Sequence, residues 1–377
     1  MERVYLDYAA TTPTRLEVIE EVSSTMNSYW ANPSSQYKRG REAKAKLEAS
    51  RKKIADLLAI DKDGIIFTSG ATEANNLLIK ANAYRLKAAG KGTHLITGKA
   101  EHASVYETFK DLEKKGFTVT YLDLDENGAY SVEDLKANLS DDTSLVSLMT
   151  VNNETGVIMP IKEISKLLKE KDIFFHTDCV QGIGKMDTSF LASCVDAFSM
   201  SAHKIYGPKG IGVAYQDPKI GLKGLNLGGH QEADRRAGTE SVALAAGLAK
   251  ALELIEAHKT EYLEKIQALV SYFYEQLDAA HIDYEINGHG DKYPGIQNVW
   301  FKGQDASQAL IKLDLNGVEV SAGSACAAGS LEKSRVLESM FKEGPRLDES
   351  LRISFGIFTE KADVDKFVKT IKVIIDA

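Results

Sequence analysis

One lysine stands where its environment would change its chemistry. Lys204 lies in the segment 201–208, which follows the apolar run 197–200 and contains a Gly-Pro step. The apolar run predicts a buried strand, and the Gly-Pro step ends any regular element. A lysine at the end of a core strand loses hydration, so its pKa falls and its amine becomes a nucleophile toward carbonyl groups. The competing interpretation is a lysine whose stem packs at the strand end while its amine reaches water.

Other polar residues follow other predicted strands. Asp178 ends the apolar run 173–177, with Gln181 three residues later, and a carboxylate there is costly to bury unless it meets a cation. The segment 69–73 joins a strand end to a helix start, where free backbone N–H groups bind anions; an ordinary helix cap is the alternative. His102 also follows a predicted strand. The two interpretations are a site residue and a surface or capping histidine.

Together these features predict a cofactor. Ligands of open α/β sheets bind beyond the carboxyl ends of the strands. The GxxxxGK[ST] and GxGxxG patterns are missing from the sequence, so a bound phosphate is not expected to belong to a nucleotide. An anion cradle, a buried acid and a nucleophilic lysine are what pyridoxal phosphate requires, because the lysine holds its aldehyde as an imine and the acid keeps its ring nitrogen protonated.

The elements that would position these residues alternate along the chain. Continuous apolar strands between helices indicate a mostly parallel sheet covered on both faces. We expect strands at 65–68, 94–97, 117–122, 145–151, 173–177 and 197–200. We expect helices at 15–28, 38–58, 73–88 and 161–171, a helix that opens with the segment 101–104 and ends at Gly116, and a helix capped by Ser131.

A long stretch with apolar residues every three or four positions, 241–280, predicts a helix at the boundary between two domains. Beyond it the elements are shorter and indicate an α+β lobe. The expected elements there are strands at 298–302, 318–321 and 351–355 and helices at 305–315 and 361–375.

Composition limits the classes of function. The chain has 377 residues, 44% of them hydrophobic, with a formal net charge of −8, which argues against a protein that binds nucleic acid or a membrane surface. Three cysteines, with no CxxC pair and no HExxH motif, argue against a disulfide framework and against zinc. The N-terminus lacks the long apolar region of a signal peptide, so we expect a cytoplasmic protein.

The sequence resembles, nearly from end to end, the cysteine desulfurases of the NifS/IscS kind, which are fold-type I pyridoxal-phosphate enzymes. No one motif is specific, but their combination is. The resemblance is carried by the segments 5–13, 32–35, 67–73, 101–102, 151–154, 203–210, 236–239 and 323–326.

The resemblance implies a role for each matching residue. Lys204 would form the imine with pyridoxal 5'-phosphate and shuttle protons, and Asp178 would pair with its ring nitrogen. Gln181 would contact the ring hydroxyl, and His102 would stack on the ring and take part in acid–base steps. The remaining implied residues are Ala71, Thr72, Ser201, His203 and Asn153 for the cofactor, Thr239 reaching in from the second subunit of a homodimer, and Arg352, Asn153 and Asn32 for the substrate.

Cys326 distinguishes between members of this fold. The residues around it, 321–330, are nearly all small, as in a loop that packs little and can move; a small buried hydrophobe is the alternative. By the resemblance, the Cys326 thiolate takes the sulfur of L-cysteine as a persulfide, alanine leaves, and the sulfur passes to an acceptor. Cys179, beside Asp178, is expected to serve packing rather than sulfur transfer.

The resemblance also implies the architecture and the partners. We expect a large domain with a mostly parallel seven-stranded sheet, residues 15–258, and a smaller α+β domain, residues 1–14 and 259–377, that carries the cysteine loop. The acceptor would be a tRNA thiouridylase or an iron–sulfur scaffold protein, and the end of the chain at Ala377 favours the former. The alternatives are a selenocysteine lyase or aminotransferase of the same fold, and a non-catalytic sulfur-relay or scaffold protein.

Overall fold

A computed structural model describes residues 3–323 and 333–376. Its centre is a seven-stranded sheet with the strand order β2-β8-β7-β6-β5-β3-β4. Only β8 runs antiparallel to its neighbours, so the mostly parallel sheet expected from the sequence is confirmed. The strands are β2 (Ile65–Thr68), β3 (His94–Gly98), β4 (Thr118–Leu122), β5 (Thr143–Ser147), β6 (Phe174–Asp178), β7 (Ala197–Ser201) and β8 (Gly212–Gln216).

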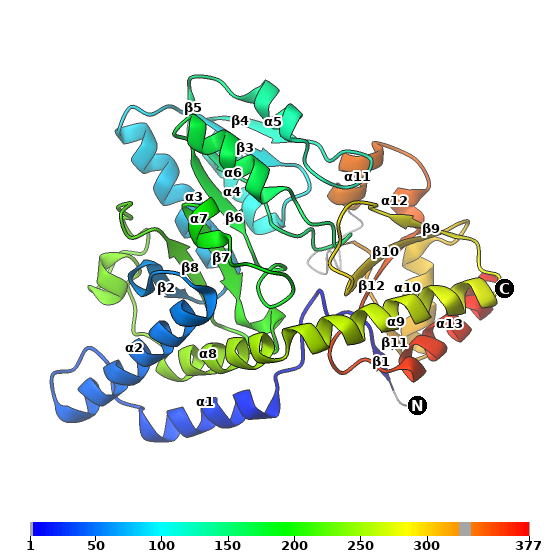
Figure 1. Cartoon of the computed structure of the whole chain (residues 1–377), viewed down its shortest axis with the longest axis horizontal. Coiled ribbons are helices and arrows are strands. Elements are labelled where there is room, and N and C mark those ends of the chain that lie inside the picture. Colours follow the sequence, from blue (N-terminus) through cyan, green and yellow to red (C-terminus); the bar gives the residue numbers. More distant parts are fainter. Residues whose placement is uncertain (1–2, 324–332, 377) are drawn as a thin grey trace.

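Helices cover both faces of this sheet because its strands are apolar on both sides (Figure 1). Within β2, Ile65 and Phe67 pack into one core and Ile66 into the other. The helices of this region are α1 (Leu16–Ser28), α2 (Lys38–Leu58), α3 (Ala71–Ala88), α4 (Ala103–Glu113), α5 (Val132–Asn138), α6 (Ile161–Glu170), α7 (Leu191–Cys194) and α8 (Val242–Ala257), with the short 3-10 turns η1 (Lys62–Gly64), η2 (Ala202–Lys204) and η3 (Gln231–Asp234).

A second hydrophobic core is formed by C-terminal elements together with the first residues of the chain. This part of the molecule lies on the right in Figure 1. A three-stranded antiparallel sheet has the order β12-β10-β9, and the N-terminal strand β1 pairs with β11 in a separate ribbon. The elements of this region are β1 (Val4–Tyr5), α9 (Lys259–Ala279), β9 (Tyr284–Asn287), β10 (Ile296–Phe301), α10 (Ala306–Leu315), β11 (Val318–Glu319), α11 (Arg335–Phe341), α12 (Arg346–Glu349), β12 (Ser350–Ser354) and α13 (Lys361–Ile375). Of these, α11 and α12 pack their apolar residues against the core of the large sheet.

Several predicted elements differ in extent from the observed ones, and two of them change the description of the fold. The single helix expected over 241–280 is two helices, because the backbone at His258 leaves the helical region and ends α8 before α9 begins. The strand expected over 145–151 ends at Ser147, although Leu148 and Thr150 still donate backbone hydrogen bonds to the next strand. This irregular continuation carries residues of the cavity described below. No helix in the described part of the chain is long and apolar enough to cross a membrane.

Candidate active site

A cavity of about 480 Å³ lies beyond the carboxyl ends of the central strands. It is lined by residues that follow β2, β3, β5, β6 and β7, together with the N-terminal segment and β12. Ten residues implied by the sequence line it: Ala71, Thr72, His102, Asn153, Asp178, Gln181, Ser201, His203, Lys204 and Arg352. The sheet therefore brings together residues that are up to 281 positions apart, from Ala71 to Arg352 (352 minus 71).

Three predicted site residues are not placed in this cavity. Asn32 is exposed, and its side-chain oxygen accepts a hydrogen bond from the backbone of Ser34 instead. Thr239 is also exposed and does not line the cavity of its own chain. Cys326 lies outside the described residues. The roles of all the predicted site residues, these three included, stay predictions.

Lys204 is held at the end of β7 by the N-terminal segment. Its amine donates hydrogen bonds of 2.6 Å to the backbone oxygens of both Ala9 and Ala10. Thr12 ties the lysine turn down, because its hydroxyl donates to the oxygen of His203 and accepts from the N–H of Tyr206. Sequence reasoning assigned no role to Thr12, although it stands in one of the matching motifs.

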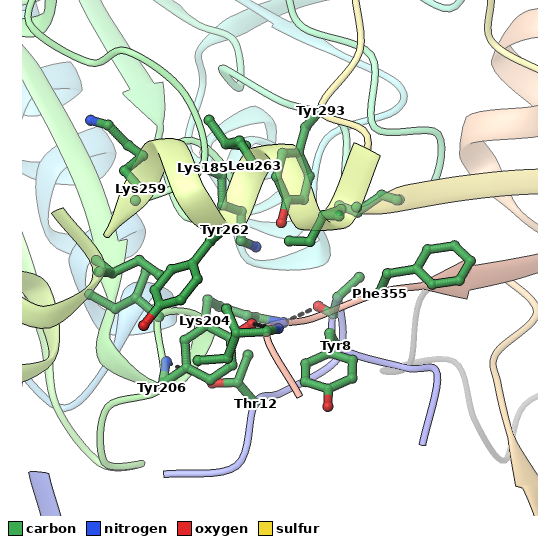
Figure 2. Close-up of a pocket in the computed structure, with 18 residues that line it drawn as sticks. Tyr8, Thr12, Lys185, Lys204, Tyr206, Lys259, Tyr262, Leu263, Tyr293 and Phe355 are labelled. Carbon is green, nitrogen blue, oxygen red and sulfur yellow. Dashed lines mark hydrogen bonds between the residues drawn. The ribbon is translucent and has the colours of Figure 1, made fainter. Parts of the chain in front are cut away.

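A second, smaller space of about 20 Å³ adjoins Lys204 (Figure 2). It is lined mainly by aromatic and aliphatic side chains of the two cores, and Lys185 also points into it. Lys204 and Ala9 line both spaces.

Asp178 is buried at the end of β6 and is held in place by two donors. Asn75, on α3, donates a hydrogen bond of 2.8 Å to one carboxylate oxygen, and the N–H of Val180 donates to the other. Asn75 also binds the hydroxyl of Ser104. Asn75 was not predicted as a site residue, because a lone asparagine within a helix carries no sequence signal for such a role.

His102 and Glu101 stand side by side after β3. The N–H of Ser104 donates to His102 Nδ1, so a neutral ring carries its proton on Nε2. Glu101 is completely buried; one oxygen accepts from the N–H of Met149, and burial raises the pKa of its carboxyl to about 8. The group beside His102 is therefore a neutral carboxylic acid at pH 7.

Arg352 enters the cavity from β12 with its side chain only 1% exposed. Its Nη2 pairs with Asp7 at 2.7 Å, and its Nη1 donates to the backbone oxygen of Asn153. Its Nε is buried without a hydrogen-bond partner among the described residues. Arg352 also lines the cavity, and a guanidinium there suits a ligand with acceptor oxygens.

Glu154 lies at the edge of the site, next to both described ends of the segment that contains Cys326. The hydroxyl of Ser334 donates to its carboxylate, and Gly323 lies close to the same oxygen. Burial raises the pKa of Glu154 above its ordinary value, and the nearby charge of Arg352 counteracts this in part. In the sequence, Glu154 stands out only as part of the matching segment 151–154.

The residues present fit pyridoxal phosphate. The 18-residue helix α3 starts at the cavity, and no side chain caps its first turn, so its free N–H groups suit a phosphate. Ser201 and His203 lie at the same end, and burial lowers the pKa of His203 to about 4, so its neutral ring can donate or accept a hydrogen bond. The buried acid Asp178 suits the ring nitrogen, and the amine of Lys204 suits the aldehyde.

Comparison with known proteins agrees with this geometry. The model of the aminotransferase class-V family matches residues 4–367. The cysteine desulfurase IscS of Dictyoglomus turgidum is 42% identical over 99% of this chain and 94% of its own. The putative cysteine desulfurase IscS 1 of Bacillus subtilis is 43% identical over 95% of this chain and 94% of its own.

Solved structures agree as well. A NifS-like protein superposes with a TM-score of 0.92 at 33% identity, covering 99% of each chain. Both kinds of comparison extend over nearly the whole sequence. This chain belongs to the class-V aminotransferase family and, within it, to the cysteine desulfurases of the NifS/IscS kind.

Proposed function

We propose that this protein removes sulfur from L-cysteine, giving L-alanine and a persulfide on Cys326. The observation that carries the proposal is the single cavity in which Lys204, Asp178, His102 and Arg352 meet around space for one small ligand. The relatives named above as cysteine desulfurases support the same reaction. Bound pyridoxal phosphate supplies the electron sink that makes the bonds of the substrate labile.

The residues of the chain have distinct parts in this reaction. Arg352 and Asn153 bind the substrate carboxylate and set its orientation, for which a planar guanidinium suits better than an ammonium. Lys204 holds the cofactor and moves the proton at the substrate α-carbon, and His102, through Nε2, exchanges protons beside it. Asp178, fixed by Asn75, keeps the ring nitrogen protonated.

Cys326 receives the sulfur. Its thiolate forms an S–S bond to the substrate sulfur while the C–S bond breaks and leaves its electron pair on the amino-acid side, where a proton completes the methyl group of alanine. An ordinary thiol has a pKa of about 8.5, so the site must favour the thiolate or supply a base. The position of Glu154 beside Gly323 and Ser334 supports placing this segment at the cavity edge.

We also propose a cytoplasmic homodimer that passes its sulfur to a protein acceptor, either a tRNA thiouridylase or an iron–sulfur scaffold protein. Exposed apolar side chains support the dimer: Leu227 is 94% exposed, and Leu16 and Trp30 are both more than half exposed. Thr239 would then serve the cofactor of the second copy. Cys179 and Cys194 are free thiols, which agrees with a reducing compartment.

The test is release of sulfide and alanine from L-cysteine by purified protein. We expect Cys326→Ala to keep the visible colour of the cofactor and to lose both products. Cys194→Ala, which removes a partly exposed cysteine elsewhere, is the matched control and should retain full activity. A Cys326→Ala variant as active as the unmodified protein would instead indicate a lyase or an aminotransferase.

A further inference from the structure

Lys185 is a lysine close to the active site that the reaction described above does not use. It lines the small space that adjoins Lys204, and Figure 2 shows both side chains pointing into that space. Burial lowers the pKa of the Lys185 amine well below its usual value, and the charges of Lys204 and Arg352 lower it further. The charged form of an amine so placed would destabilise the fold unless something compensated for it.

No acidic side chain among the described residues compensates for the burial of the Lys185 amine. In the described part of the chain Lys185 forms no ion pair with a carboxylate. Among the described residues, its amine donates a hydrogen bond to the side-chain oxygen of Gln181, four residues earlier. The ring of Tyr293 lies against it, with 5.6 Å between the amine and the ring centroid.

This contact determines which end of the Gln181 amide faces the cofactor. Gln181 is 4% exposed and lines the large cavity. Its oxygen is taken by Lys185, while its nitrogen donates to the backbone oxygen of Ala9 at 3.0 Å. An amide nitrogen has two N–H bonds, so one remains for a group in the cavity.

We propose that Lys185 is a positioning residue: by donating to the oxygen of Gln181 it fixes that amide with its nitrogen toward the cavity, so that Gln181 acts as a hydrogen-bond donor to the ring oxygen of bound pyridoxal phosphate. Without Lys185 only the hydrogen bond to the oxygen of Ala9 opposes rotation of the amide, and the rotated amide would present its oxygen, which would repel an anionic ring oxygen. The inference rests on the proposed function for the identity of the cofactor.

The test is a double-mutant cycle on the full-length holoenzyme, with Lys185→Met, Gln181→Leu and the double variant. The readouts are the pH midpoint of the cofactor's visible absorption and the retention of pyridoxal phosphate during dialysis. An N–H donor to the ring oxygen favours the deprotonated chromophore, so its loss raises the midpoint. We expect Lys185→Met to raise the midpoint and to weaken cofactor binding about tenfold, the scale of one hydrogen bond.

In the Gln181→Leu background the same Lys185→Met change should have no further effect, because Lys185 acts through Gln181. An equal shift in both backgrounds would show that the charge of Lys185 acts directly through space, and it would overturn the proposal. An unchanged midpoint in Lys185→Met would also overturn it.

A second variant covers the case in which Lys185→Met does not fold. Gln181→Glu keeps an acceptor for Lys185 but removes the N–H, so it should fold and still raise the midpoint; an unchanged midpoint would contradict the donor role. Sulfide release by the unmodified protein is measured in parallel. If the protein is coloured but releases no sulfide, the proposed function fails while this inference is still decided by the midpoints.

Discussion

At the scale of single residues, the charged groups of the site are each held by neutral or oppositely charged neighbours before any ligand binds. Asp7 pairs with Arg352 and also accepts from the hydroxyl of Ser321. Asn75 fixes Asp178, and Thr12 fixes the turn that carries Lys204. The reacting groups therefore lose little conformational freedom when the substrate enters, which favours catalysis.

Replacing Arg352 with lysine tests the role of its guanidinium. Lys cannot form the two parallel hydrogen bonds that hold a carboxylate, so we expect the KM for L-cysteine to rise about tenfold, or about 1.4 kcal/mol, with a smaller change in kcat and with the colour retained. Steady-state kinetics measure this. Arg346→Lys, which changes an arginine paired with Glu285 outside the cavity, is the control, and an equal effect there would refute the assignment.

The neutral carboxyl of Glu101 predicts a pH dependence of stability. Its pKa is raised by burial to about 8 in the folded protein and returns to about 4.3 on unfolding. Between these values the folded state binds more protons, so the contribution of Glu101 to stability falls as pH rises from about 4.3 to about 8 and is then constant.

A Glu101→Gln variant should remove this dependence because its amide stays neutral. We expect the Tm of the variant, relative to the unmodified protein, to be higher at pH 8 than at pH 5. Thermal unfolding at both pH values measures it, with Glu20→Gln on the exposed face of α1 as the control. A difference in Tm that does not change with pH would show that Glu101 is ionised in the folded protein.

The sequence predicted the residues that carry the chemistry better than those that support them. Lys204 and Asp178 stand at strand ends in recognisable patterns, and ten implied residues line one cavity. Lys185 escaped prediction because a lysine four residues after a glutamine carries no sequence signal, and Asn75 because it acts through contacts made across the fold. For the same reason no pattern in the sequence indicates that Arg352 would be paired with Asp7.

At the scale of elements, the junction between β2 and α3 lines the cavity and is its proposed anion-binding end. Gly70 caps α3 with φ 155° and ψ 179°, a conformation that essentially only glycine adopts. A Cβ there would lie 4.0 Å from the hydroxyl of Ser201, so space is sufficient and the cost of a side chain is backbone strain alone.

Gly70→Ala should therefore destabilise the protein by about 1–3 kcal/mol and loosen the bound cofactor. Thermal unfolding and retention of pyridoxal phosphate during dialysis are the measurements. Gly221→Ala, at a glycine with ordinary φ and open surroundings, is the matched control and should change neither quantity. Unchanged stability and cofactor retention in Gly70→Ala would contradict the assignment of this junction.

Element boundaries show what periodicity can and cannot predict. The bounds of α2 and of β2 were predicted to the residue, because apolar spacing and flanking polar residues mark both ends. The break between α8 and α9 was missed, because the apolar spacing continues across His258 and no Gly or Pro marks the kink. Strand β8 was also missed, since it directly follows the turn after Lys204.

At the scale of the whole molecule, the division at residues 14 and 258 remains a prediction, although the described chain has separate cores around the large sheet and around β10 and β12. The N-terminal segment links these parts, because Leu6 packs in one core and Tyr8 in the other. The backbone oxygens of Ala9 and Ala10 in this segment accept hydrogen bonds from the amine of Lys204. The position of Lys204 therefore depends on both parts of the molecule.

The proposed homodimer predicts that surface apolar residues matter for cofactor binding. Leu227→Glu places a charge on a side chain that is 94% exposed in the single chain. If Leu227 is covered by a second copy, sedimentation velocity should show a shift from dimer toward monomer, and pyridoxal phosphate should be lost faster because Thr239 is withdrawn. Ile311→Glu, at an exposed position of α10, is the control; equal dimer content in all three proteins would place the interface elsewhere.

The central claim is that sulfur from L-cysteine passes to Cys326. The most direct measurement is mass spectrometry of the cysteine-containing peptides after a single turnover, before any acceptor or reductant is added. The account predicts that the peptide with Cys326 becomes heavier by one sulfur atom while those with Cys179 and Cys194 do not change. Alanine formation with no added sulfur on Cys326, or with the sulfur on Cys194, would contradict it.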